Sequence, residues 1–310
     1  MSLTDTAAVA TRRARLSRHV SFLAYDDFRF LKIALVAVVL AIVLYVAVPP
    51  YGERFGGGWA GYTLGTVGAL LIVWLTWFGY RKRTYNPERK YVSAHGHDSA
   101  AVEEAHPLED PSRLARRLSA HVYLGLALLI IATLHTGFHF GWNIHTLAYA
   151  LMCVVIVSGI YGVVAYVRYP RQMTENRENL TLAQMQAQIT AIDAELRRRV
   201  MPLDDATTTI IRDSLDHTPI GGSMWRQVSG CYPDCGTAKA IALLRANPKE
   251  SDETWRMLRS KLDEKATFVG RLRHDIRFKA LMDIWLYLHV PLTFALLAAL
   301  IAHIVSVFYL

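Results

Sequence analysis

Five long apolar blocks limit what this chain can fold into more than any other feature of its sequence. Polar segments separate them, and they cover residues 33–49, 59–80, 118–140, 144–167 and 281–310. A helix needs about 20 apolar residues to cross the hydrocarbon core of a bilayer, and each block is close to or above that length. With 53% hydrophobic residues, the chain also exceeds the norm for soluble proteins. The sequence therefore predicts an all-α membrane protein with five transmembrane helices.

The distribution of basic residues predicts the orientation of these helices. Arg and Lys are frequent in the N-terminal arm, in the loop after the second block and in the segment after the fourth block. The first loop holds Arg54 alone, and the third loop, GWN, holds no basic residue. Because basic loops stay in the cytoplasm, we expect a bacterial inner-membrane protein with a cytoplasmic N-terminus and a periplasmic C-terminus. The net charge of +8 then reflects topology, and nucleic-acid binding is not expected.

This topology divides the chain into six parts. They are a cytoplasmic N-terminal arm (1–28), helices one and two (29–80), a cytoplasmic loop (81–117), helices three and four (118–167), a cytoplasmic helical insert (168–280) and helix five (281–310). The loop contains His95, His97 and His106, which we expect to be solvated because a second ligand cluster is missing.

The insert is predicted to be helical. Its first apolar residues recur at three- and four-residue steps: Leu182, Met185, Ile189, Ile192 and Leu196. This spacing predicts an amphipathic helix, and we expect its apolar stripe to lie on the membrane surface or on a partner. Residues 220–241 then predict a loop and a short helix, and residues 250–273 a second amphipathic helix leading into the last block. The insert lacks nucleotide-binding and nucleophile motifs, so it is not expected to be catalytic.

Two cysteines of the insert, Cys231 and Cys235 in CYPDC, are expected to be reduced in the cytoplasm. Two thiols do not hold an iron–sulfur cluster by themselves, since such clusters usually take four. A structural role and a redox or partner-facing role both stay open.

Two of the apolar blocks carry histidines at the same separation. His121 and His135 are 14 residues apart in the third block, and so are His289 and His303 in the fifth. Fourteen residues of α-helix leave an angular offset of about 40° and a rise of roughly 21 Å. Each pair thus lies on one helix face, with one member near each side of the hydrocarbon core. The two helices run in the same direction, so His121 is expected to face His289 and His135 to face His303.

Matched imidazoles on parallel helices suit haem. A haem iron accepts two axial imidazoles, and its apolar macrocycle fits within a helix bundle. Two such haems, one near each face, would carry electrons across the membrane. A single membrane histidine is also often a structural residue or a proton relay. Two alternatives therefore stay open: a histidine-based, proton-coupled transporter, and a membrane anchor subunit without haem.

Two further histidines, His139 and His145, flank the short outer loop. His139 is 18 residues after His121, which gives no angular offset on a continuous helix, so it is an alternative to His135 as the outer ligand. We prefer His135 because its spacing copies that of helix five. His139 and His145 are also candidates for contacting a haem propionate or a quinone headgroup, or for facing water. Pro291 is expected to kink helix five just after His289.

Two stretches resemble bacterial dihaem cytochrome b subunits of the cytochrome b and ferric-reductase-like membrane group. They are HVYLGLALLIIATLHTGFHFGWNIHTLAYALMCVVIVSGIYGVVAYVRYPR, from His121, and DIWLYLHVPLTFALLAALIAHI, from Asp283. The resemblance implies two haem b groups with His121, His135, His289 and His303 as axial ligands of iron. It also implies an iron–sulfur, ferredoxin-type or flavoprotein partner at the cytoplasmic face, in a multi-subunit complex or homodimer, with a quinone as a further candidate cofactor.

The chain departs from larger members of that group. It has five spans, lacks a PEW-type quinol-oxidation motif, and lacks the flavin and nicotinamide domain of ferric reductases. We therefore expect an electron-transfer subunit of a respiratory oxidoreductase complex, which conducts electrons but is not catalytic alone. The insert is the expected docking surface for its redox partner.

Overall fold

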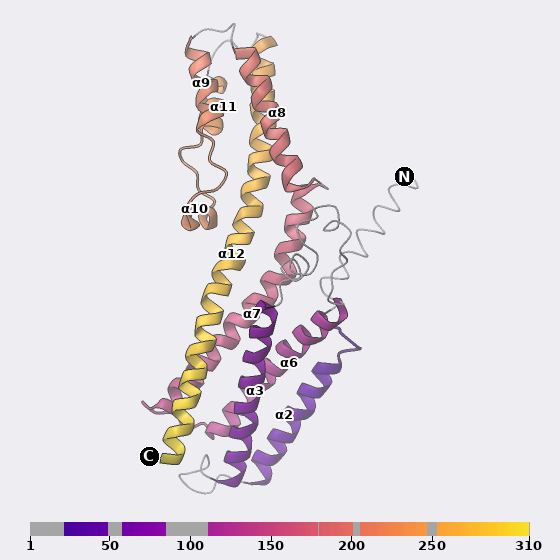
Figure 1. Ribbon diagram of the computed structural model, residues 1–310, viewed down its shortest axis with the longest axis vertical. Helices are drawn as coiled ribbons and strands as arrows, with labels where there is room; N and C mark the ends of the chain where they lie inside the picture. Colours follow the sequence, from indigo (N-terminus) through magenta and orange to yellow (C-terminus); the bar gives the residue numbers. More distant parts are fainter. Residues whose placement is uncertain are drawn as a thin grey trace, which may run out of the picture. The chain divides into compact units, whose positions relative to one another are not determined.

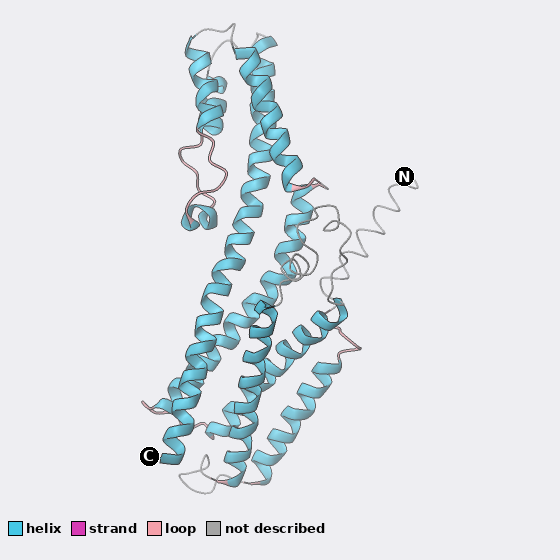
Figure 2. Cartoon of the chain, viewed as in Figure 1, coloured by secondary structure: helices cyan, strands magenta, loops and turns pink. Residues whose placement is uncertain are grey.

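The computed structural model describes residues 22–48, 58–84, 111–178, 180–200, 205–246 and 253–309. Within these residues the regular structure is entirely helical (Figure 2). The helices, labelled in Figure 1, are α2 (Arg29–Ala47), α3 (Trp59–Thr84), α6 (Pro111–Thr136), α7 (Ile144–Arg177), α8 (Leu182–Val200), α9 (Asp205–Asp216), α10 (Met224–Ser229), α11 (Gly236–Ala246) and α12 (Glu253–Tyr309). Five of the described helices, namely α2, α3, α6, α7 and α12, are long and apolar enough to cross a membrane. The predicted all-α membrane fold is confirmed.

The helix ends differ from the ends of the apolar blocks. α7 continues past Val167 through Pro170, and α12 begins within the polar insert and continues through Pro291. In contrast, α6 ends at Thr136, before its apolar block does, because Gly137 and Phe138 adopt left-handed backbone with φ of 55° and 61°. Hydropathy indicates which residues suit lipid, whereas backbone conformation decides where a helix ends. The kink at Pro291 stays a prediction.

The chain forms two compact units. The membrane unit comprises Met1–Val167 and Leu286–Leu310, and the insert unit comprises Arg168–Trp285. The first division coincides with the start of the insert expected from the sequence, and the second lies five residues after its expected end at residue 280.

Two hydrophobic cores hold the membrane unit together. One joins α2, α3 and α6 through Ala34, Ala41, Leu64, Ala127, Ile131 and Leu134. The other joins α3, α6, α7 and α12 through Ile72, Leu128, Met152, Leu296 and Leu300. Many large apolar side chains on the outer faces of these helices are exposed, such as Leu40 at 63% and Val157 at 66%, as expected for positions that face lipid.

The apolar stripe of α8 is buried inside the insert unit, which corrects the expectation that it faces the membrane or a partner. Met185, Ile189, Ile192 and Leu196 are at most 7% exposed. They share two cores with residues of α12, among them Leu258, Leu262, Val269 and Leu272. An amphipathic pattern indicates that one helix face is covered but not what covers it. Here the N-terminal half of α12 does so.

A buried ion pair joins three helices of the insert unit. Lys265 of α12 is 1% exposed, and its Nζ lies 2.6 Å from Asp193 Oδ1 of α8. The same ammonium group donates a hydrogen bond of 2.7 Å to the carbonyl oxygen of Ser214 in α9. The sequence did not suggest α9 as a helix, and this bond helps to hold it against α12.

We expect Lys265→Ala to destabilise the insert unit by about 3 kcal/mol, because it leaves the Asp193 carboxylate without its buried charge partner. The Ser214 carbonyl oxygen loses one donor but still accepts from Thr218 Oγ1 at 2.7 Å. Lys261→Ala, one turn earlier on α12, is the matched control. Hydrogen bonds to Glu264 and Glu195 raise the pKa of Lys261, but these are surface pairs and contribute little to stability. Hydrogen exchange of α9 and α12 peptides in the full chain measures both variants, and equal losses of protection would contradict the special role of Lys265.

Candidate functional site

Three histidine rings meet in the membrane unit where α6 ends, α7 begins and α12 approaches its end. The ring centroids of His135 and His303 are 6.1 Å apart, with an angle of 87° between the ring planes. His145 lies on the other side of His303, with centroids 4.6 Å apart and a hydrogen bond between the two Nδ1 atoms. The structure thus brings together His135 and His303, which the sequence paired, and adds His145 to them.

The ring of His135 is held by two glycines of α3. Its Nδ1 lies 2.8 Å from the carbonyl oxygen of Gly61, so this nitrogen donates the hydrogen bond and Nε2 is left as the basic nitrogen. One turn further along α3, a Cβ on Gly65 would lie only 2.7 Å from Cε1 of the ring. The ring therefore fits only because Gly65 has no side chain. Sequence reasoning missed both glycines, although their four-residue spacing is a known signal for close helix approach in membranes.

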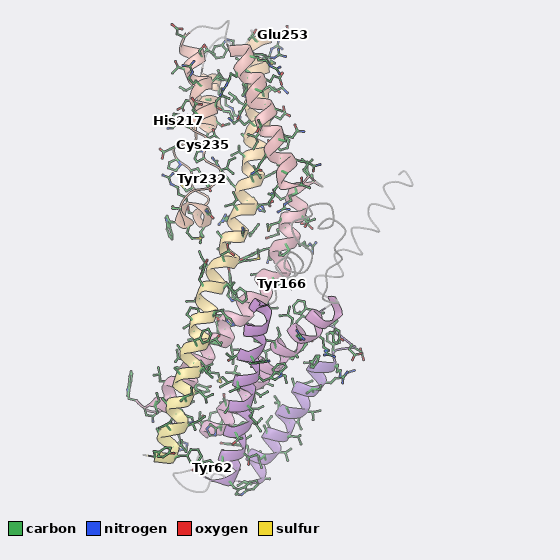
Figure 3. All side chains as sticks on the ribbon, in the orientation of Figure 1. Tyr62, Tyr166, His217, Tyr232, Cys235 and Glu253 are labelled. Atoms are coloured by element: carbon green, nitrogen blue, oxygen red, sulfur yellow. The ribbon has the colours of Figure 1, made fainter. Side chains whose placement is uncertain are left out.

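His303 is oriented from α7. Its hydrogen bond with His145 joins two Nδ1 atoms, so one ring donates and the other accepts. When His303 donates, its Nε2 becomes the basic nitrogen, as in His135. Tyr62 of α3, which Figure 3 labels, stacks on Phe308 of α12 with ring centroids 6.4 Å apart.

His289 lies deeper along α12 and also contacts α7. Its Nδ1 is 2.7 Å from the hydroxyl oxygen of Ser158. A Cβ on the neighbouring Gly159 would come to 3.5 Å from Cε1 of the ring, an ordinary contact distance. His289 therefore shares with His135 and His303 a bonded Nδ1.

The register between α6 and α12 bears on whether His121 lies near His289, the pair expected at the cytoplasmic side of the membrane. Leu128 and Leu296 pack in the same core, and each lies seven residues, or roughly two turns, after the first histidine of its helix. Since His135 and His303 also meet, a constant register places His121 level with His289. His121 is half-buried on α6, and its pairing with His289 stays a prediction. Among the described residues the α6 backbone packs closely against α2 and α3.

His139 does not lie on the helix face to which the sequence assigned it. α6 ends at Thr136, and the exposed His139 follows in a turn whose backbone N–H donates to the Thr136 carbonyl at 3.0 Å. The angular argument for His139 assumed a continuous helix, so it does not apply. His95, His97 and His106 lie outside the described residues.

The donor atoms of this site suit a bis-imidazole iron. Two metal–nitrogen bonds of about 2 Å, with a ring radius of about 1.1 Å on each side, place two axial ring centroids about 6 Å apart. The observed 6.1 Å is close to this value, and it also lies within the range of about 4.5–7 Å for an edge-to-face contact between two rings. Histidines that bind metals usually engage their other nitrogen with a nearby hydrogen-bond partner. In His135, His303 and His289, Nδ1 has such a partner. No group of three or more His, Cys, Asp and Glu in the described part of the chain has the arrangement of a metal site, but a haem iron needs only two protein ligands.

Comparison with known proteins gives no match: neither protein-family models, nor curated proteins, nor solved structures align significantly with the chain.

We expect Gly65→Ala to lower the thermal stability of the membrane unit, because a methyl group 2.7 Å from Cε1 of His135 forces the ring off the Gly61 carbonyl. Overpacking of this kind costs about 1–3 kcal/mol. Gly68→Ala is the matched control on the same helix, since its nearest neighbour, Leu128 Cδ1, is at 3.8 Å. Thermal unfolding of the full chain in detergent compares the two. Equal midpoints for both variants would show that His135 is not held against α3.

Proposed function

We propose that this chain is a b-type dihaem cytochrome. It carries electrons across the bacterial inner membrane between a cytoplasmic or quinone-linked redox partner and an acceptor at the other face. The observation that carries the proposal is the His135–His303 pair, in which rings from two membrane helices are 6.1 Å apart and nearly perpendicular. Further support comes from the equal 14-residue spacing on α6 and α12, which provides a second pair of imidazoles.

In this proposal His135 and His303 hold one haem iron through Nε2, and His121 and His289 hold the other. A haem held in this way supplies reversible one-electron transfer. Gly61 orients His135, His145 orients His303, and Ser158 orients His289. An imidazole that is bonded at both nitrogens costs less to keep in lipid than one with an unpaired nitrogen.

The residues between the two histidine levels keep the path apolar. Leu128 and Leu296 stand midway between the histidines of their helices, and Met152 and Ile72 pack against them. This packing leaves little room for water or ions to cross between the levels. The membrane unit is therefore suited to carry electrons rather than a polar solute.

The insert unit is our candidate docking surface for an iron–sulfur, ferredoxin-type or flavoprotein partner. With the stripe of α8 buried, docking has to use other parts of its surface. Exposed Arg197, Arg198 and Arg199 at the end of α8 provide a basic patch suited to an acidic partner. If deletion of the insert left electron entry from the partner unchanged, this docking role would be wrong.

One observation favours a second candidate function. The His145–His303 hydrogen bond joins an exposed ring to a half-buried one, as a proton relay would. A proton-coupled transporter built on this relay would be colourless and would show pH-dependent flux in vesicles. A membrane anchor would show neither haem nor flux.

We expect His135→Ala and His303→Ala each to halve the haem content of the purified chain, because each removes one ligand of one iron while the other site lies roughly 21 Å away. Wild type should hold two haem b per chain. His139→Ala is the control and should keep both haems, since His139 lies off the helix. Pyridine haemochrome quantitation measures the content, and full retention in both ligand variants would refute this assignment.

We expect His145→Ala to retain haem at purification but to lose it roughly 10–100-fold faster to an excess of apomyoglobin, because His303 loses the partner that orients its ring. His145→Asn restores a hydrogen-bonding group and should recover part of the retention. The midpoint potential of the outer haem provides a second readout. Unchanged retention and potential in His145→Ala would mean that the hydrogen bond has no positioning role.

A further inference from the structure

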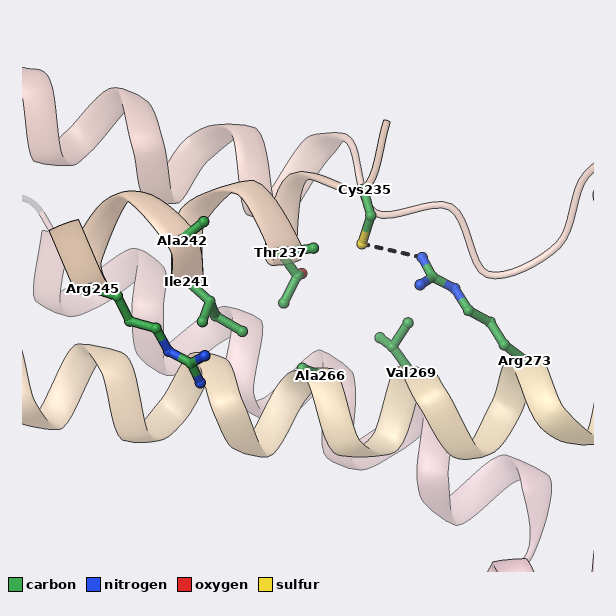
Figure 4. A pocket seen from close by; sticks show the side chains of 9 residues that line it. Cys235, Thr237, Ile241, Ala242, Arg245, Ala266, Val269 and Arg273 are labelled. Carbon is green, nitrogen blue, oxygen red and sulfur yellow. Dashed lines mark hydrogen bonds between the residues drawn. The ribbon is translucent and has the colours of Figure 1, made fainter. Parts of the chain in front are cut away.

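A cavity of about 460 Å³ lies inside the insert unit between α11 and α12 (Figure 4). Its volume is within the range of small-molecule sites. Arg273 and Cys235 stand at one end and Arg245 at the other, and Ile241 and Val269 form much of the wall between them. The electron path proposed for the membrane unit makes no use of it.

Arg273 is held in place at its end of the cavity. Its Nε and Nη2 donate to the carbonyl oxygen of Pro219 at 3.0 and 2.6 Å, and the guanidinium lies 4.0 Å above the ring of Tyr232. Nη2 is also 3.2 Å from Sγ of Cys235, a weak acceptor. Among the described residues, no carboxylate pairs with this half-buried cation, although charges removed from water are usually paired.

The remaining wall adds positive charge and apolar surface. Arg245 is the second cation and pairs with Asp263 at 3.5 Å. The described residues that line the cavity include no acidic side chain. α11 starts at Gly236, directly after Cys235, so the positive end of an 11-residue helix also lies beside Arg273. Alanines, Ile241 and Val269 complete the wall. A ligand that fits these features is anionic at one end and apolar over its body.

We propose that this cavity binds a small soluble anion, a phosphate or carboxylate on a short apolar body, with Arg273 as its charge partner. The planar guanidinium suits the oxygens of either group, and Ile241 and Val269 contact the apolar body.

A lipid headgroup carries similar charge. However, Arg273 precedes the apolar stretch that begins at Leu281 by eight residues, or about 12 Å of helix. This exceeds a headgroup layer of about 5–7 Å and favours a soluble ligand. The site would make the insert unit a ligand-responsive module, whether or not the membrane unit binds haem.

Cys235 provides the readout, because its thiol lies at the cavity wall. Cys235 is only 4% exposed, so we expect its alkylation to be slower than that of the exposed Cys231 and to depend on access through the cavity. The full chain is placed in phosphatidylcholine nanodiscs and treated with N-ethylmaleimide, and alkylation of each cysteine is followed by peptide mass spectrometry. Phenyl phosphate is the probe. Inorganic phosphate, which lacks the apolar group, is the comparison and should bind more weakly. We expect phenyl phosphate to slow alkylation of Cys235 in a saturable manner and to leave the rate at Cys231 unchanged.

Three variants make this test decisive. Arg273→Gln should raise the half-saturating concentration of phenyl phosphate roughly tenfold or more, since it removes a charged hydrogen-bond donor. Arg256→Gln, at an exposed position on the same helix, should leave that concentration unchanged. Ala266→Leu fills the cavity without changing charge and should abolish protection even if Arg273→Gln disturbs the loop at Pro219. The proposal is overturned if phenyl phosphate gives no saturable protection, or if Arg273→Gln and Ala266→Leu both keep it. If Cys235 is protected from alkylation in nanodiscs that contain phosphatidic acid but is not protected by phenyl phosphate, the ligand is a lipid and the proposal of a soluble ligand is overturned.

Discussion

An imidazole inside a bilayer needs a partner for each of its nitrogens, because an unpaired polar group in hydrocarbon costs several kcal/mol. The helices of this chain provide the partner of Nδ1 in three cases: a backbone carbonyl for His135, a second imidazole for His303 and a hydroxyl for His289. These bonds orient the three rings, and in His135 and His303 they direct Nδ1 to a protein partner. An iron bound between His135 and His303 would satisfy both rings at once.

The packing of the membrane unit follows from this requirement. α3 approaches α6 closely enough for the His135 ring to reach a backbone carbonyl, and Gly65 makes that approach possible. α12 meets α6 through Leu128 and Leu296, which share one core, and through the neighbouring rings of His135 and His303. Glycines of α3 thus accommodate the His135 ring, while leucines and histidine rings form the contact between α6 and α12.

Helical periodicity predicted part of this site and could not predict the rest. The 14-residue spacing correctly paired His135 with His303 as neighbours, because both lie on uninterrupted helices. It misplaced His139, since a left-handed residue such as Phe138 ends a helix without a signal in hydropathy. Periodicity also did not predict the contact of His145 with His303, because that contact depends on how a short loop returns the chain. In the insert, periodicity found the apolar stripe of α8 but did not show that α12 covers it. Nothing in the sequence distinguished the buried Lys265 from the other cations of the insert.

Electron paramagnetic resonance of the oxidised, purified chain tests the central claim most directly. Two axial imidazoles with nearly perpendicular planes, as in the 87° between His135 and His303, should give a low-spin ferric signal of the highly anisotropic type. His303→Ala should remove that signal. A protein that is free of iron after expression with ample haem, or one that shows only high-spin ferric haem, would contradict the bis-imidazole site.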